Sequence, residues 1–298
     1  MNFLKLNILK NYLTINYLLI FSFFFYSIYI LRYQYDGHHI GLMYSNALDL
    51  INGNIPYKEI FIQYGFFTTL IHSIILIIFE QKVFFITVFN CVFYYLGIFF
   101  ISKSINNFIN NNFALISTIL ILFNHPIPWL PWSNYIAFFF ISISIFYLSK
   151  KNKNFLLIGF FLSLSILSRQ ELFIPILISF IFFSIFYLLD KNKLYFNYIY
   201  QLLIGFFAPL LLFILFLFYI DVFNIWTKYL EIPAFYLKIY EISFMELIYN
   251  FIIFFSTESF FNFIVTPQYF LISVILIFNI ILIIIKIINK IKIEKNIF

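Results

Sequence analysis

The chain has 298 residues, of which 64% are hydrophobic and only 10% are charged, and its mean hydropathy is +1.00. Soluble domains carry about 25% charged residues, so this composition excludes an ordinary soluble domain and indicates a polytopic membrane protein. A single cysteine, Cys91, excludes an internal disulfide. The formal net charge of +6 does not imply nucleic-acid binding, because Lys and Arg mark the cytoplasmic loops of a membrane protein.

The apolar runs predict an all-α bundle with about eight transmembrane spans, which together form a single membrane domain over residues 1–298. The first run is long enough to cross about 30 Å of hydrocarbon. It leads into bulky residues rather than a small-residue cleavage site, so we interpret it as an uncleaved span. The expected spans are 13–31, 83–101, 113–124, 135–149, 154–168, 172–189, 199–219 and 268–285.

The run 66–79 is apolar but shorter than a typical span, which favours a re-entrant or interfacial segment. If it does not cross, twelve of the eighteen Lys and Arg residues fall on one side, as the positive-inside rule requires. If it does cross, the basic stretches 150–153 and 191–193 lie on the wrong side. We therefore expect both termini in the cytoplasm and the protein in the plasma (inner) membrane of a bacterium. Ten of the twelve acidic residues and all four His then face outward.

The outer segment 33–65 holds the first candidate site residues. Asp36 follows the first span beside Gly37, where a carboxylate can act as general base towards a hydroxyl group. The alternative is an Asp that caps a helix beginning near His39. His38 and His39 can contact a phosphate or a metal ion, or they can be plain interfacial residues. Adjacent side chains point to different sides, so at most one of the two is expected to share a site with Asp36.

The rest of this segment and three later outer segments have clear local patterns. Apolar residues within 42–51 fall on one face of a helix, which predicts a helix on the membrane surface that ends at Gly53. The Pro- and Trp-rich stretch 124–135 predicts a rigid interfacial turn, and 221–268 predicts interfacial amphipathic helices. The turn LSRQELF at 167–173 places Arg169 and Glu171 between two spans. They form either a structural ion pair or a phosphate site, because the guanidinium is a planar and permanently charged donor.

In their order along the chain, these pieces resemble the GT-C superfamily of membrane glycosyltransferases, which includes the protein mannosyltransferases and aminoarabinose transferases. The resemblance rests on Asp36, on ALDLINGNIPYKEIFIQYGFFTTL at 47–70, on the LSRQEL turn and on DVFNIWTKYLEIP at 221–233. It covers about residues 10–235 and implies a seven-span module, which an interfacial segment and one further span follow at 236–298. Where the family has YGP and PYRD, this chain has YGF and PYKE. It also lacks an acidic residue in the second outer loop.

The resemblance implies an inverting transfer of a sugar from a polyprenyl-phosphate donor to a lipid, glycan or protein acceptor on the outer face. Asp36 would be the base. The donor phosphate would lie against Arg169, His38, His39 and Lys58, with support from Tyr57, Glu59, Glu171 and His125. No cofactor is certain, and a divalent metal ion stays possible. The alternatives are an inactive member of the family and a transporter or flippase of lipid-linked intermediates, which predicts ionisable residues at mid-membrane depth and paired halves.

Overall fold

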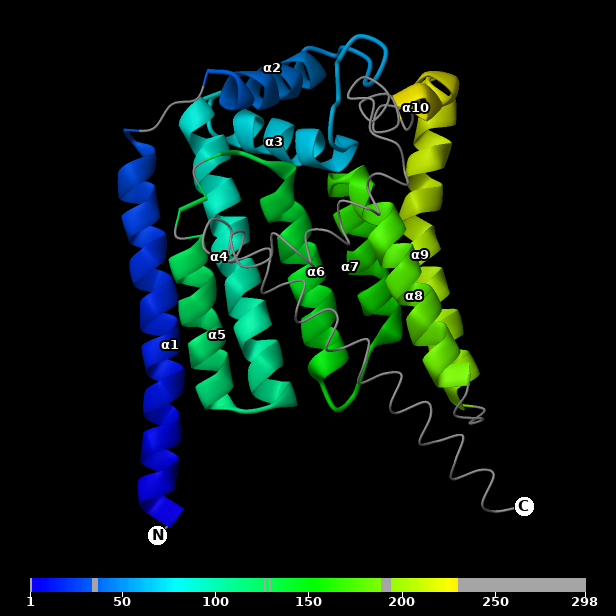
Figure 1. The fold of residues 1–298 in the computed structure, drawn as a ribbon. Helices are drawn as coiled ribbons and strands as arrows, with labels where there is room; N and C mark the ends of the chain where they lie inside the picture. Colours follow the sequence, from blue (N-terminus) through cyan, green and yellow to red (C-terminus); the bar gives the residue numbers. More distant parts are fainter. Residues whose placement is uncertain (1, 34–36, 126, 129, 189–193, 230–298) are drawn as a thin grey trace, which may run out of the picture. The chain divides into compact units, whose positions relative to one another are not determined.

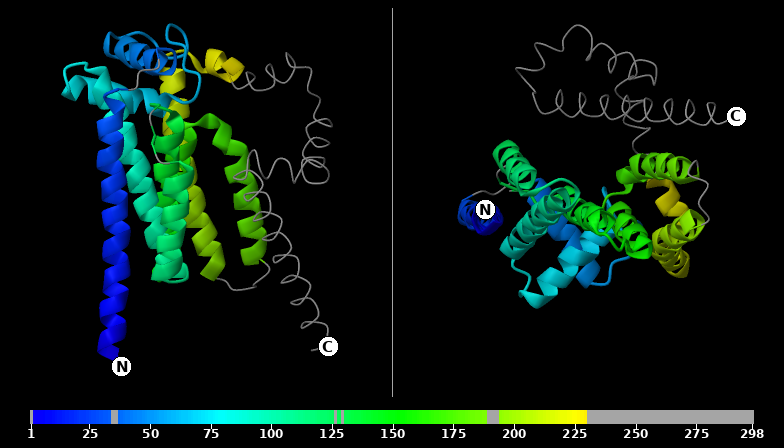
Figure 2. Two further views of the ribbon diagram at one scale, coloured as in Figure 1. Left: turned by 60° about the vertical axis from the view of Figure 1, so that its left-hand side comes forward. Right: turned by 90° about the horizontal axis from the view of Figure 1, so that it is seen from below.

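Every regular element in the described part of the chain is helical. The structure is a computed structural model that describes residues 2–33, 37–125, 127–128, 130–188 and 194–229. Seven helices run side by side in two different views (Figures 1 and 2). They are α1 (Asn2–Leu31), α4 (Val83–Phe108), α5 (Asn111–Asn124), α6 (Ser133–Ser149), α7 (Phe155–Ser168), α8 (Phe173–Leu188) and α9 (Leu194–Tyr219).

The remaining elements lie at one end of these upright helices. In Figure 1, α2 (His39–Ile51) and α3 (Phe66–Ile78) lie across that end, and α10 (Phe223–Tyr229) follows α9 there. A short 3-10 turn, η1 (Gln170–Leu172), joins α7 to α8. The charge pattern predicted that 66–79 does not cross the membrane. The structure shows α3 lying crosswise to the upright helices, and the membrane crossing itself stays a prediction.

Three of the described helices are long and apolar enough to cross a membrane, judged by length and composition: Thr14–Leu31, Val83–Phe108 and Asn197–Tyr219. Shorter apolar helices occupy Phe66–Ile78, Asn111–Phe123, Ser133–Ser149, Phe155–Ser168 and Gln170–Ser179. The all-helical, membrane-type architecture is thus confirmed for the described residues. The eight-span topology stays a prediction, and the expected segments from 230 onward, including the span 268–285, lie outside the described residues.

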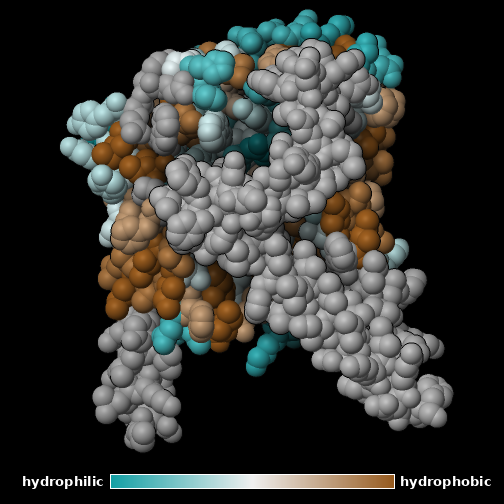
Figure 3. Space-filling view, viewed as in Figure 1, coloured by the Kyte–Doolittle hydropathy of each residue, from teal (hydrophilic) through white to brown (hydrophobic). Residues whose placement is uncertain are grey.

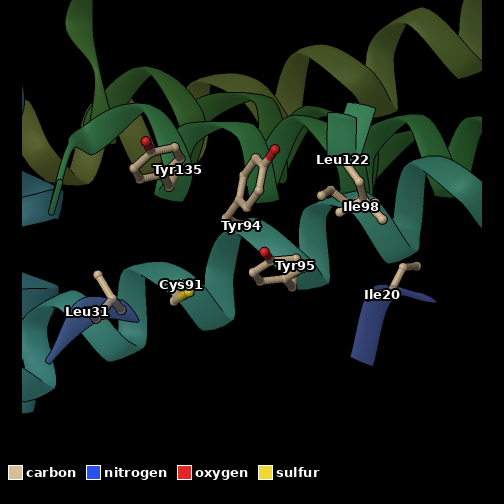
Figure 4. Close-up of a cluster of buried hydrophobic side chains, with 8 residues drawn as sticks. All are labelled: Ile20, Leu31, Cys91, Tyr94, Tyr95, Ile98, Leu122 and Tyr135. Atoms are coloured by element: carbon tan, nitrogen blue, oxygen red, sulfur yellow. The ribbon is translucent and has the colours of Figure 1, made fainter. Parts of the chain in front are cut away.

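On the face drawn in Figure 3, the visible sides of the upright helices are mainly hydrophobic, and many hydrophilic side chains gather at the end where α2 lies. The largest core cluster joins α1, α4, α5 and α6 (Figure 4). In this cluster Tyr94 of α4 and Tyr135 of α6 are neighbours, and their ring centres are 5.3 Å apart. This part of the core therefore relies on aromatic packing between helices.

On the other side of the bundle, α7 and α9 cross at two glycines. A Cβ atom on Gly159 would lie 2.7 Å from the backbone nitrogen of Phe206, and one on Gly205 would lie 2.9 Å from the carbonyl carbon of Leu156. Real side chains do not come this close to a backbone. The two glycines therefore let the helices approach more closely than larger residues allow, as small residues commonly do in membranes.

Candidate functional site

The helix α2 presents the first outer segment, and local sequence explains both of its ends. It begins at His39, so the N-cap position is His38, whose side chain makes no capping hydrogen bond. At its other end Gly53 has φ +88°, its amide donates to the carbonyl of Leu50 at 3.2 Å, and the amide of Asn54 donates to that of Asp49 at 3.0 Å. This pattern is a Schellman motif. The predicted helix and its glycine end are confirmed, and its place on the membrane surface stays a prediction.

The turn after α2 is held by one of the predicted supporting residues. Oε2 of Glu59 accepts a hydrogen bond from the backbone N–H of Ile55 at 2.7 Å. The amide of Tyr57 donates to the carbonyl of Ile60 at 3.1 Å, which closes the turn around Tyr57 in the left-handed region at φ 66°. Lys58 lies on this turn and is exposed. The Glu59 carboxylate thus shapes the turn that presents Lys58.

Tyr57 fastens this turn to α9 and α10. It is 3% exposed and belongs to a cluster with Leu217 and Val222. Its ring centre lies 5.3 Å from that of Tyr229, whose hydroxyl donates to the Tyr57 carbonyl at 3.3 Å. Burial raises the pKa of the Tyr57 phenol, and hydrogen bonds with the Phe66 backbone and the Trp226 side chain oppose that rise. Tyr57 is therefore a neutral anchor of the turn at neutral pH.

The stretch between this turn and α3 docks onto the turn between α7 and α8. The hydroxyl of Thr68 donates to the carbonyl of Ser168 at 2.9 Å, and the amide of Gln170 donates to the carbonyl of Tyr64 at 3.1 Å. A Cβ on Gly65 would lie 2.6 Å from the carbonyl carbon of Ser168. The YG pair is therefore the point at which the first outer segment touches the LSRQEL turn.

Arg169 lies at this contact and is held on two sides. Its Nε donates to Oε2 of Glu171 at 2.8 Å, and its guanidinium carbon is 5.6 Å from the centre of the Tyr64 ring. The side chains of Arg169 and Glu171 are 25% and 45% exposed. The predicted ion pair is thus present. It uses Nε and one Nη, so the end edge of the guanidinium, which carries N–H groups of both Nη atoms, is not used by this pair.

The histidine candidates lie elsewhere at the same end of the bundle. The start of α2 lies towards α1, whereas Arg169 follows α7 beside the start of α3 (Figure 1). The ring of His39 packs against that of Trp132 with centres 5.5 Å apart, and Nε2 of His125 is 3.4 Å from the Tyr135 hydroxyl. The structure therefore brings Tyr57, Lys58 and Glu59 together on one turn and Arg169 with Glu171 on another. Asp36 lies outside the described residues.

Two features of this end were missed by the sequence reasoning. Tyr64 belongs to the quoted YGF stretch, but only the structure shows that its ring faces Arg169. His72, in α3, is fully buried, and the amide nitrogen of Asn90 lies 2.9 Å from its Nε2. Burial lowers the pKa of His72 to about 4, although the bond with Asn90 acts the opposite way. A lone His inside an apolar helix gave no signal that could have indicated this pair.

Among the residues that the structure describes, no three His, Cys, Asp or Glu side chains lie close enough together to hold a metal ion. Comparison of the chain with protein-family models, with curated proteins and with solved structures found no match.

Proposed function

We propose that this protein is an inverting glycosyltransferase that moves a sugar from a polyprenyl-phosphate donor to a lipid, glycan or protein acceptor at the outer face of a membrane crossed by about eight spans. One observation carries the proposal. Three of the four pieces on which the resemblance rests are 47–70, 167–172 and 221–233, the last described as far as 229. They are distant in sequence but meet at one end of the bundle. This convergence supports a shared site.

Arg169 is the residue that best suits the donor phosphate. Glu171 and the Tyr64 ring fix the plane of the guanidinium, so little side-chain freedom is lost when a ligand binds. The end edge of the guanidinium can then donate two parallel hydrogen bonds to phosphate oxygens. This contact strengthens as the sugar–phosphate bond breaks and negative charge collects on the leaving phosphate, which is the condition for catalysis by charge stabilisation.

In the proposed reaction Asp36 accepts the proton of the acceptor hydroxyl. The hydroxyl oxygen attacks C1 of the sugar from the side opposite the phosphate, the bond from C1 to the phosphate oxygen breaks, and polyprenyl phosphate leaves with the bonding electron pair. The configuration at C1 is inverted. This role for Asp36 rests on its position in the sequence after the first span. His38 follows two residues later and occupies the N-cap position of α2, so that position does not fall to Asp36.

The direct test is to incubate the purified full chain with a panel of polyprenyl-phosphate sugars and to detect released polyprenyl phosphate, with and without a chelator. We expect release from at least one donor. Arg169→Lys should lower turnover by roughly 10² to 10³ because an ammonium cannot reproduce the bidentate contact. If the Lys variant turned over donor as fast as the parent, the phosphate role would be wrong.

Asp36 is tested with a variant that keeps its size. Asp36→Asn should lower turnover by roughly 10² to 10⁴ because the proton acceptor is lost, while expression and donor binding persist. Asp49→Asn, on α2, is the matched control, and we expect it to be mild. An Asp36→Asn protein with parental turnover would refute the mechanism. Release from no donor by correctly folded protein would refute the proposed function as a whole.

A further inference from the structure

The helices α1 and α4 are tied together by hydrogen bonds at two levels. The side-chain amide of Asn16 donates to the hydroxyl of Ser102, and the hydroxyls of Ser27 and Tyr95 lie 2.6 Å apart. Asn16 and Ser27 are separated by about 16 Å along α1, at a rise of about 1.5 Å per residue. Hydrogen bonds between helices hold such polar groups in an apolar surrounding. These two bridges fix the spacing of α1 and α4.

Between the bridges the two helices do not pack fully, and a cavity of about 360 Å³ lies between them. Each helix contributes four residues at the spacing i, i+3, i+4 and i+7, which is one face of a helix. The α1 wall is Tyr17, Ile20, Phe21 and Phe24, and the α4 wall is Val92, Tyr95, Leu96 and Phe99. Figure 4 shows one residue of each wall, Ile20 and Tyr95.

The cavity is open at its side. Ring contacts connect its two walls, between Tyr17 and Phe99 with centres 5.4 Å apart and between Phe24 and Tyr95 at 5.7 Å. Phe21 is nevertheless 62% exposed and Leu96 is 40% exposed. The cavity is therefore a lateral groove with aromatic walls. Both helices are long and apolar enough to cross a membrane, so this groove lies at the depth of the lipid chains.

A lysine lies at one end of the groove, and the charge pattern places that end at the cytoplasmic side. Nζ of Lys103 lies 4.6 Å from the centre of the Phe99 ring, one turn beyond the groove on α4. From Phe99 to Val92 the groove follows α4 for about 10 Å, at a rise of about 1.5 Å per residue. A positive charge thus lies at the membrane surface, and the apolar groove runs inward from it. The charge matches an anionic headgroup, and the groove matches the hydrocarbon chain of the same lipid.

We propose that this groove binds a single anionic phospholipid of the cytoplasmic leaflet, with its phosphate at Lys103 and one acyl chain between α1 and α4. The two bridges prevent α1 and α4 from separating enough to admit a helix, which is about 10 to 12 Å wide. The groove lies at α1 and α4, away from the α7 to α8 turn that holds Arg169 (Figure 2). This site is therefore independent of the proposed transfer reaction.

The binding is specific through shape and charge and not through the hydrophobic effect, because lipid tails are as apolar as the groove. The acyl chain gains dispersion contacts with the aromatic walls, and the phosphate gains the Lys103 charge. A lipid held in this way should exchange more slowly than bulk lipid and should be enriched at these residues over a neutral lipid.

The test places the full chain in phosphatidylcholine nanodiscs that contain a little phosphatidylglycerol with a photoactivatable diazirine in one acyl chain. Crosslinks are mapped by peptide mass spectrometry. We expect crosslinks in 17–24 and 92–99 to exceed, several-fold, those in lipid-facing parts of α9. Leu96→Trp, which fills the groove, and Lys103→Gln should each lower the groove crosslinks several-fold.

Two matched variants serve as controls. Leu18→Trp makes the same change as Leu96→Trp on an exposed face of α1 outside the groove. Lys150→Gln removes another Lys that lies over aromatic rings, at 4.5 Å from the centres of Phe146 and Tyr147, but that lines no part of the groove. Both should leave the groove crosslinks unchanged. Should Leu96→Trp fail to fold, as judged by size-exclusion profile, Val92→Phe takes its place.

Three results would overturn the proposal. Even labelling of the groove and of α9 would mean that only bulk lipid is present. A neutral phosphatidylcholine probe that labels the groove as strongly as the anionic probe would remove the role of Lys103. Displacement of the probe by polyprenyl phosphate at lower concentration than by unlabelled phosphatidylglycerol would mean that the groove takes a different lipid.

Discussion

Replacing Gly65 by Ala is the sharpest perturbation of the contact between the first outer segment and the turn after α7. A Cβ at this position would lie 2.5 Å from the carbonyl oxygen and 2.6 Å from the carbonyl carbon of Ser168. Both atoms belong to the backbone, so they cannot rotate away. The substitution should therefore push the two segments apart.

The expected cost follows from what the contact holds together. Separation would break the hydrogen bonds from Thr68 to Ser168 and from Gln170 to Tyr64, each worth about 0.5 to 1.5 kcal/mol. Forcing one extra carbon into a packed contact adds about 1 to 3 kcal/mol. Gly65→Ala should thus lower the free energy of unfolding by about 2 to 6 kcal/mol, and it should release Arg169 from Tyr64.

The assay compares thermal unfolding midpoints of purified parent and variant in detergent, together with the rate of proteolytic cleavage at the exposed Lys58. Gly41→Ala is the matched control, because a Cβ on Gly41 meets nothing within 4 Å. Inside a helix this change should be neutral or stabilising by up to about 1 kcal/mol. Equal midpoints and equal cleavage rates for parent and Gly65→Ala would refute the reasoning.

Three further predictions concern other parts of the chain. Burial lowers the pKa of His72 from 6.5 to about 4. Between pH 6.5 and pH 4 this side chain therefore takes up a proton in the unfolded chain but not in the folded chain. Stability should therefore fall by about 3 kcal/mol as pH drops from 6.5 to 4, and a His72→Gln variant with the same pH profile of its thermal midpoint would contradict this. Gly159→Ala and Gly205→Ala should each cost several degrees of thermal midpoint, because each Cβ meets the backbone of the facing helix; parental midpoints would show that α7 and α9 can separate freely. Finally, Lys103→Cys and Lys151→Cys should not react with a membrane-impermeant thiol reagent outside intact cells, and labelling of both would exclude the eight-span topology.

The helices could be predicted because apolar runs and the polar residues that bound them are local properties of the sequence. The expected 66–79 appears as α3 (Phe66–Ile78) and 154–168 as α7 (Phe155–Ser168). α4 continues to Phe108, beyond the expected end at 101, because its polar last turns find partners. The side-chain amide of Asn107, for example, donates to the Ser149 hydroxyl at 3.0 Å. Hydropathy marks where a segment stops being apolar, not where its helix ends.

The site was predictable in its parts and not in its arrangement. An ion pair between Arg169 and Glu171 was one of the two interpretations of their turn, and it is now seen at 2.8 Å. Two features depend on how helices that are far apart in sequence cross. One is that Tyr64 faces Arg169, and the other is that His38 and His39 lie at the end of α2 away from the Tyr57 turn. The order of the motifs along the chain does not tell how far apart they lie in space. For the same reason the separation of Lys58 and Arg169 onto two turns, with His38 and His39 at the start of α2, could not be predicted until the fold was known.

The contact between Tyr57 and Tyr229 also determines when, during synthesis, the turn that carries Tyr57 can pack. The two residues are 172 positions apart, and at a synthesis rate of about 5 to 20 residues per second the ribosome needs roughly 9 to 34 s to cover that interval. During this time the first outer segment has left the ribosome, but α9 and α10 do not yet exist. The apolar side of its turn therefore lacks its partners on α9 and α10 until nearly 230 residues have been joined. This contact forms late in synthesis, although the turn that carries Tyr57 is made early.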